Sequence, residues 1–199
     1  CSTSSRCTGA ASRGANGGYK MTTLWTIRGD GEIEMQNDFA PFGQLPLLPR
    51  VGIVMSVAKD FENVRWLGRG PWENYSDRKI SAKVGLYENT VNGLYVPYVM
   101  PQEHGNHTDV RWVEIKESAT GKGLRFSGAP LLNFSASHFT ADDLYKSFHT
   151  IDLVPRAETI LNLDLAQRGV GTATCGPDTL PQYLLSGREH QFSYRIEMV

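Results

Sequence analysis

The sequence lacks an excess of charge of either sign and lacks any long apolar run. Its 199 residues carry 20 Lys and Arg against 21 Asp and Glu, a net charge of -1. A nucleic-acid-binding domain needs a basic face or stripe, which this balance does not supply. No stretch approaches the roughly 18 apolar residues of a membrane-spanning helix. We therefore expect neither a nucleic acid nor a membrane as a partner.

Cysteine is also scarce, with three residues at Cys1, Cys7 and Cys175. Three cysteines are too few for the disulfide scaffold of a chain this long, and nothing near Cys1 and Cys7 favours a disulfide between them over two free thiols. No Cys or His spacing indicates a zinc site. We expect no metal bound by this chain.

The first 18 residues differ from the rest in composition. They are rich in Ser, Gly and Ala and have no apolar period, and they also lack the apolar core of a signal peptide. Such a segment buries too little surface to offset the entropy of ordering, so we expect a flexible linker or tail over 1–18 and one domain over 19–199. Because the chain begins at Cys1 and not at Met, we expect it to be a piece of a longer protein.

Alternating apolar residues dominate the sequence after this segment. Residues 24–27 and 32–35 flank Asp30-Gly31, a strong hairpin signal, and prolines at 41, 46 and 49 predict a loop. A period of two recurs over 51–57, 124–126, 132–136, 160–165 and 192–198. Trp66 and Trp112 fall in such patterns and are expected in the core. The repeated period predicts antiparallel sheets with one buried face.

One helix is predicted, after Thr140. Asp143 stands three residues later and completes a capping-box pattern, and Leu144 and Phe148 are one turn apart on the same face. The fold class is therefore all-β, a large antiparallel β-sandwich with one short helix.

Two segments, 66–79 and 97–112, contain more Gly, Pro, aromatic and charged residues than plain turns need. The first reads WLGRGPWENYSDRK and the second PYVMPQEHGNHTDVRW. Gly70-Pro71 provides a backbone that turns sharply and then stiffens. Glu73, Asp77, Arg69 and Arg78 could form a charged hydrogen-bond network around that turn.

These residues resemble the fifth, C-terminal domain of family 2 glycoside hydrolases of the bacterial β-galactosidase type. The family marks are W-x-G-x-G-P-x-E-N-Y-x-D-R and P-Y-x-x-P-x-E-x-G. Asn133–Phe139 (NFSASHF) and Leu163–Gly171 (LDLAQRGVG) are similar to two further marks, in the family's order. The resemblance runs from about Leu45 to Val199, and the upstream half of the usual domain is not recognised.

The resemblance implies a sandwich of the galactose mutarotase-like kind and a role in hydrolysis of terminal β-galactosides. Retaining hydrolysis needs two carboxyl groups about 5 Å apart. The family supplies both, and its Mg²⁺, from a central barrel of roughly 250 residues, which this chain is too short to contain. The implied function is a carboxy-terminal accessory domain that shapes one edge of the substrate pocket, with no catalytic residue and no cofactor of its own.

The resemblance also implies which residues border that pocket. They are Gly70, Pro71, Trp72, Glu73, Asn74, Tyr75, Asp77, Arg78 and Cys175. Trp72 is the residue expected to be exposed, and Cys175 stands where many relatives carry a Trp that packs against sugar. A purely structural turn remains the alternative for the residues from Gly70 to Arg78.

Two other functions stay open. Glu103, His104 and His107 would serve a mutarotase-like enzyme if they met in a cleft, but a packed loop with an ion pair such as Glu103–Arg111 is favoured. A free-standing carbohydrate-binding module is the second alternative. The expected partners are the rest of a β-galactosidase polypeptide, its galactoside substrate and further copies in a homo-oligomer. The compartment stays open between bacterial cytoplasm and periplasm.

Overall fold

The strands form one continuous antiparallel sheet in a computed structural model, which describes residues 3–10, 17–172 and 175–199. They are β1 (Thr3–Ala10), β2 (Gly17–Ile27), β3 (Ile33–Gly43), β4 (Arg50–Val57), β5 (Phe61–Gly70), β6 (Lys83–Thr90), β7 (His107–Glu117), β8 (Gly123–Ser137), β9 (Thr159–Gln167) and β10 (His190–Met198). Helical segments are α1 (Ala141–Lys146) and the short 3₁₀ turns η1 (Asn92–Leu94), η2 (Thr150–Asp152) and η3 (Pro181–Tyr183).

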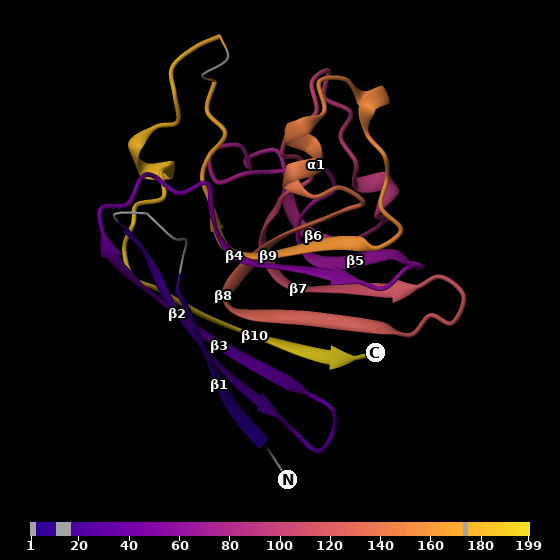
Figure 1. The fold of residues 1–199 in the computed structure, drawn as a ribbon. Helices are drawn as coiled ribbons and strands as arrows, with labels where there is room; N and C mark the ends of the chain where they lie inside the picture. Colours follow the sequence, from indigo (N-terminus) through magenta and orange to yellow (C-terminus); the bar gives the residue numbers. More distant parts are fainter. Residues whose placement is uncertain (1–2, 11–16, 173–174) are drawn as a thin grey trace.

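The sheet branches at β8. Its main path runs β1-β2-β3-β10-β8-β7-β5-β6, while β9 pairs with β8 and with β4 off this path. Residues 124–129 of β8 pair with β10, and residues 133–137 pair with β9. Between these stretches the register against β7 shifts, around Pro130, and irregularities of this kind bend a strand. The sheet therefore folds around one core (Figure 1). The predicted all-β antiparallel sandwich with one short helix is confirmed.

The core follows the predicted alternation on most strands. Trp66, Phe126 and Phe134 are fully buried, and Phe192 and Tyr194 are buried on β10. Strand β9 departs from the pattern, because Ile160 and Asp164 are buried as well as Leu161 and Leu163. The second face of β9 is covered by the segment before β7 and by α1, which a period of two cannot reveal.

The predicted hairpin at Asp30-Gly31 is confirmed. It joins β2 to β3, and Gly31 has a φ of +91°, a conformation that glycine adopts without strain. The predicted loop starts later than expected, since Pro41 lies in β3 opposite Tyr19.

The prediction of a flexible tail over 1–18 is wrong for the part that the structure describes. Residues 3–10 form β1, which pairs along its whole length with β2, and residues 17–18 belong to β2. Backbone pairing with a neighbouring strand orders a segment that cannot bury much side-chain surface by itself. Residues 1–2 and 11–16, and a disulfide between Cys1 and Cys7, lie outside what is described.

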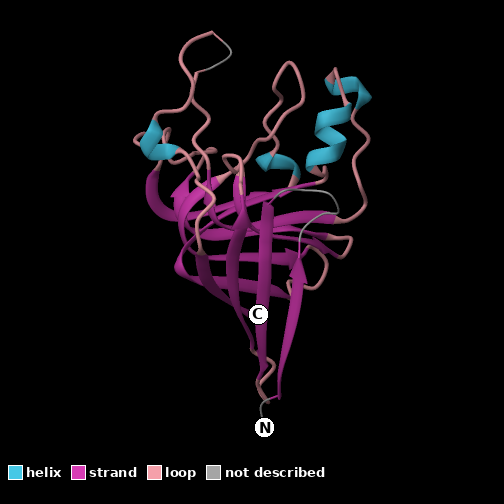
Figure 2. Ribbon diagram, turned by 60° about the vertical axis from the view of Figure 1, so that its left-hand side comes forward, coloured by secondary structure: helices cyan, strands magenta, loops and turns pink. Residues whose placement is uncertain are grey.

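The helix prediction is correct at its start and wrong at its end. Thr140 accepts a hydrogen bond from the Asp143 amide, and Asp143 accepts one from the Thr140 amide, so the capping box is present. Helix α1 ends at Lys146, and Phe148 lies beyond it with 70% of its surface exposed. Figure 2 shows the helices and long loops gathered at one end of the sheet, away from the N-terminus. In the described residues, no helix has the length and apolarity to cross a membrane.

Candidate functional site

The segment from Gly70 to Arg78 forms a tight turn at the end of β5. A Cβ atom at Gly70 would lie 2.7 Å from Cδ2 of Tyr87 and 3.1 Å from Cζ2 of Trp66, so no larger residue fits there. Gly70 and Pro71 are joined by a cis peptide bond. The turn closes where the Tyr75 amide donates to the Arg78 carbonyl at 3.1 Å and the Arg78 amide donates back at 2.9 Å.

Asn74 fixes this turn to the start of β7 from the inside. Its buried side-chain oxygen accepts from the amide of Thr108 at 2.9 Å and from the Thr108 hydroxyl at 2.6 Å. The backbone amide of Asn74 donates to the Asn106 backbone carbonyl at 2.7 Å. In return, Asn106 Nδ2 donates to the Asn74 backbone carbonyl at 2.9 Å. Four hydrogen bonds therefore join two segments that lie 32 residues apart in sequence.

Glu73 gathers donors from the turn and from the neighbouring loop. Its carboxylate accepts from Arg78 at 2.6 Å, from the Gly105 amide at 2.8 Å and from the Tyr98 hydroxyl. Burial, together with this carboxylate, raises the pKa values of Tyr75 and Tyr98 above their ordinary value. Both phenols therefore stay protonated near neutral pH. The charged network predicted around the turn is present for Glu73 and Arg78, whereas Arg69 pairs with Asp109.

Asp77 contacts a different segment, the loop after β9. Its two carboxylate oxygens accept from the amides of Val170 at 3.1 Å and Gly171 at 2.8 Å. Gly169 lies so close that a Cβ atom there would be 2.6 Å from Cγ of Asp77. Asp77 thereby joins the turn to the segment that leads to Cys175, although the two are more than 90 residues apart in sequence.

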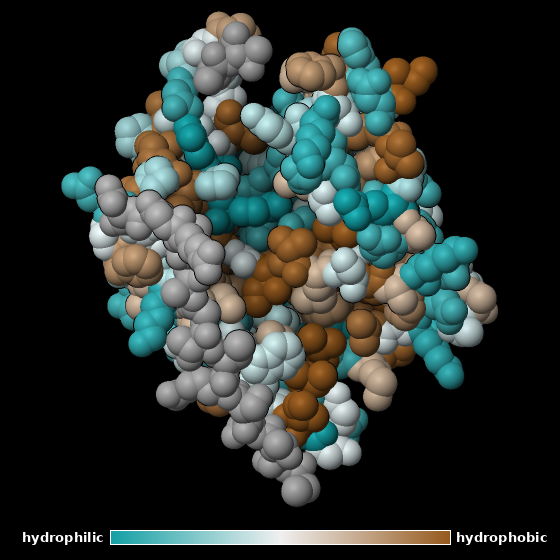
Figure 3. All heavy atoms as spheres, viewed as in Figure 1, coloured by the Kyte–Doolittle hydropathy of each residue, from teal (hydrophilic) through white to brown (hydrophobic). Residues whose placement is uncertain are grey.

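Three residues of the turn face outward. Pro71, Trp72 and Arg78 are exposed, and Trp72 has 59% of its surface accessible, as predicted. Cys175 is an exposed free thiol, and its amide donates to the Thr172 carbonyl at 3.0 Å. The predicted site residues thus divide into an inner set that holds the turn and an outer set that meets solvent. Figure 3 shows a hydrophilic hollow on the face that carries these loops, below their tips.

Glu103, His104 and His107 have separate partners. Glu103 pairs with Arg50 at 3.2 Å, which corrects the predicted pairing with Arg111. Arg111 lies on β7, and its guanidinium donates to the Asp109 carbonyl two residues away. His104 bonds the Gln102 carbonyl and packs against an aromatic ring, and His107 stacks on another within the core. No shared cleft for mutarotase-like chemistry is built from these three side chains.

His107 is expected to make the fold sensitive to mild acid. Burial lowers its pKa from 6.5 to about 4, against the opposing effect of the Pro71 and Gly105 carbonyls. The unfolded chain takes up this proton near pH 6.5, so His107 destabilises the fold as the pH falls from 6.5 to 4, by about 3 kcal/mol in total. Urea unfolding should show that His107→Gln loses less free energy of unfolding than the wild type between pH 6.5 and pH 4. Equal losses in the two proteins over this range would contradict the assignment.

Sequence reasoning missed Asp164, which lies beneath Arg50. The side chain of Asp164 is 1% exposed, and its Oδ2 lies 2.9 Å from the Arg50 guanidinium. Burial raises its pKa to about 7, although Arg50 acts in the opposite direction. Arg50, Glu103 and Asn162 also line a cavity of about 280 Å³ beside α1. The signal in the sequence was a carboxylate between two leucines of a strand.

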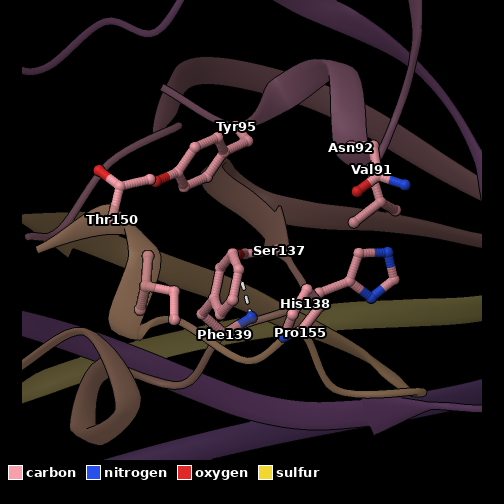
Figure 4. Close-up of a pocket in the computed structure, with 9 residues that line it drawn as sticks. Val91, Asn92, Tyr95, Ser137, His138, Phe139, Thr150 and Pro155 are labelled. Atoms are coloured by element: carbon pink, nitrogen blue, oxygen red, sulfur yellow. Dashed lines mark hydrogen bonds between the residues drawn. The ribbon is translucent and has the colours of Figure 1, made fainter. Parts of the chain in front are cut away.

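A second cavity, of about 230 Å³, lies between η1 and the end of β8. Figure 4 shows the rings of Tyr95 and Phe139 toward one side of it and the His138 imidazole turned toward the other. His138 binds Glu62 at 2.7 Å, a structural role, and none of the predicted site residues lines this cavity. Among the residues with described side chains, no group of three or more His, Cys, Asp or Glu is arranged to hold a metal ion.

Comparison with known proteins extends the resemblance to almost the whole chain. A family model described as "Beta galactosidase small chain" matches residues 2–198, so the match includes residues 2–44. The β-galactosidase of Staphylococcus xylosus is 29% identical over 89% of this chain and 18% of its own length. That of Arthrobacter sp. is 34% identical over 86% of this chain and 17% of its own. That of Kluyveromyces lactis is 38% identical over 77% of this chain and 15% of its own.

This chain therefore spans less than a fifth of the length of these relatives. Among solved structures, a GalM/aldose epimerase homologue from C. elegans aligns over 100% of this chain and 65% of its own, with 11% identity and a TM-score of 0.42.

Proposed function

The chain belongs to the β-galactosidase small-chain family, and on this premise we propose that it is the carboxy-terminal accessory domain of an enzyme that hydrolyses terminal β-galactosides. The family match over residues 2–198 carries the proposal. The partner of the domain is then the remainder of the same polypeptide. The whole polypeptide would bind the galactoside and could associate with further copies of itself as a homo-oligomer.

The carboxylates of the turn support an accessory role. A retaining glycosidase needs one carboxylate free to attack the sugar and a second that gives and takes a proton. Glu73 accepts from Arg78 and from the Gly105 amide, and Asp77 accepts from two backbone amides. Carboxylates held by several donors are poor nucleophiles. We place the catalytic pair, and the Mg²⁺ of the full enzyme, in the remainder of the polypeptide.

In this proposal the domain forms one edge of the substrate pocket. The inner residues Glu73, Asn74 and Tyr75 keep the turn rigid, so that Pro71, Trp72 and Arg78 stand at fixed places on the surface. Asp77 brings the segment that carries Cys175 to the same turn. Cys175 offers a small thiol and no flat apolar face on which a sugar could pack. The side chain at position 175 is then expected to contribute less to the affinity for the galactoside than a Trp contributes in a relative that has one there.

We expect this chain alone to hydrolyse no β-galactoside, and the full-length polypeptide to hydrolyse it with retention of configuration. The physical reason is that both reacting carboxylates lie outside the chain. The measurement is product formation from a nitrophenyl β-galactoside, with the anomer followed by NMR. Hydrolysis by the isolated chain, or a gene with no barrel before residue 1, would contradict the proposal. Galactoside binding by the isolated chain in calorimetry would instead favour a carbohydrate-binding module.

A further inference from the structure

We propose that Asp77 is a positioning residue that sets where the Cys175 loop stands at the pocket edge. The Cys175 loop is defined here by residues 168–172 and 175–180. The inference rests on the proposed function, because it assigns that edge to a particular loop. It goes further in naming the side chain that holds the loop and the kinetic constant that this side chain controls.

Asp77 contacts the base of the Cys175 loop directly. Each carboxylate oxygen of Asp77 takes one backbone amide, Oδ1 from Val170 and Oδ2 from Gly171. Two consecutive amides that point at one carboxylate form an anion-binding concavity of the backbone. Charge-assisted bonds of this kind are roughly twice as strong as neutral ones. Gly171 has a φ of +61°, which lets its amide turn toward the carboxylate.

Hydrogen bonds between the two arms of the loop reinforce this base from the other side. The buried hydroxyl of Thr179 donates to the Gly169 carbonyl at 2.8 Å. The Thr172 amide and hydroxyl both donate to the Pro177 carbonyl, at 3.3 and 3.0 Å. The two arms of the loop are therefore joined to each other, and Asp77 joins them to the turn.

The described residues at the tip of the loop have no such anchor in the sheet. Thr172, Cys175, Gly176 and Pro177 are exposed, and the hydrogen bonds given above for Thr172 and Cys175 stay within the loop. A rigid base with an exposed tip transmits any displacement of the base to the tip. The hydrogen bonds described for Asp77 go to backbone amides of this loop, so Asp77 acts on substrate through the loop and takes no part in bond making or breaking.

The experiment uses the full-length polypeptide and three graded changes. Asp77→Asn keeps the shape but offers an amide nitrogen to one of the two N–H groups, and Asp77→Ala removes both acceptors. Thr179→Val loosens the same base from the other arm. Asp152→Asn is the matched control, since Asp152 accepts from the His149 amide at 2.9 Å on a distant loop. The readouts are kcat and KM for a β-galactoside, and amide exchange at Val170 and Gly171.

We expect KM to rise from wild type to Asp77→Asn to Asp77→Ala, reaching on the order of tenfold, with kcat changed much less, because the loop contributes binding and not chemistry. Thr179→Val should act in the same direction, and amide exchange should quicken in step. A merely structural role would lower the melting temperature and leave KM unchanged in the folded enzyme, which would overturn the inference. An inactive wild-type polypeptide would overturn the proposed function as well.

Discussion

Replacing Arg50 with methionine is expected to destabilise this chain by about 3 to 5 kcal/mol at pH 8, because it leaves the carboxylate of Asp164 buried without a partner. Asp164 is 1% exposed, and Arg50 is the cation beside it, at 2.9 Å. Glu103, which also pairs with Arg50, is itself an anion and cannot replace it. Urea unfolding of the two proteins measures the difference.

The destabilisation caused by Arg50→Met should depend on pH, because it depends on whether Asp164 is protonated. Burial raises its folded-state pKa from 3.8 to about 7, so this carboxyl stabilises the fold fully below pH 3.8 and less as the pH rises through 7. Without Arg50 the folded-state pKa should rise further, so the variant should recover stability between pH 8 and pH 5. Adding Asp164→Leu to Arg50→Met should restore much of the loss. Equal destabilisation at both pH values would contradict this account.

A matched control is available in Arg65. Its Nε lies 3.2 Å from Glu88, but the two side chains are 43% and 72% exposed. Exposed pairs contribute about 0 to 1 kcal/mol, so Arg65→Met should change the free energy of unfolding within that range. The contrast between two Arg–carboxylate pairs separates the effect of burial from the effect of charge alone.

Trp66→Ala is expected to cost about 3 to 5 kcal/mol of the free energy of unfolding. Trp66 is fully buried and packs against Tyr87, His107 and Phe134, with ring centroids 4.6 to 5.6 Å apart. Its indole N–H donates to the Arg69 carbonyl at 3.0 Å. The substitution would leave a cavity directly beneath Gly70 and the start of the turn.

The control is the same substitution at Trp112. That residue was predicted in the core, but it is half-buried and lies against the Arg125 guanidinium, 4.9 Å from its ring. We expect Trp112→Ala to cost clearly less than Trp66→Ala in urea unfolding, and Trp66→Phe to recover part of the loss. If both Trp→Ala variants lost the same free energy, the packing assigned to Trp66 would be wrong.

Much of the fold could be predicted from local pattern. The period of two in β10 and the Asp30-Gly31 hairpin depend on residues close in sequence, and both are confirmed. The cap of α1 is also local, since Thr140 and Asp143 are one turn apart. The end of α1 was not predicted, because Phe148 fits a helical face but faces solvent beyond Lys146.

Contacts between distant segments escaped prediction for the opposite reason. A Ser/Gly-rich segment carries no period of its own, yet residues 3–10 pair with β2. The pairing of Glu103 with Arg50 and not with Arg111 depends on how the segment before β7 crosses β4 and β9. Charge alone could not distinguish the two arginines.

The sequence by itself determined that this protein is an all-β chain, since strand period, turns and caps are set by neighbours along the chain, and its linked motifs identified the family. Only the tertiary structure decided which site residues act together. It placed Glu73 against the Gly105 amide, Asp77 against Val170 and Gly171, and Asp164 beneath Arg50. Those contacts join residues 32 to more than 110 positions apart, and their partners are chosen by the folding of the sheet and not by any local preference.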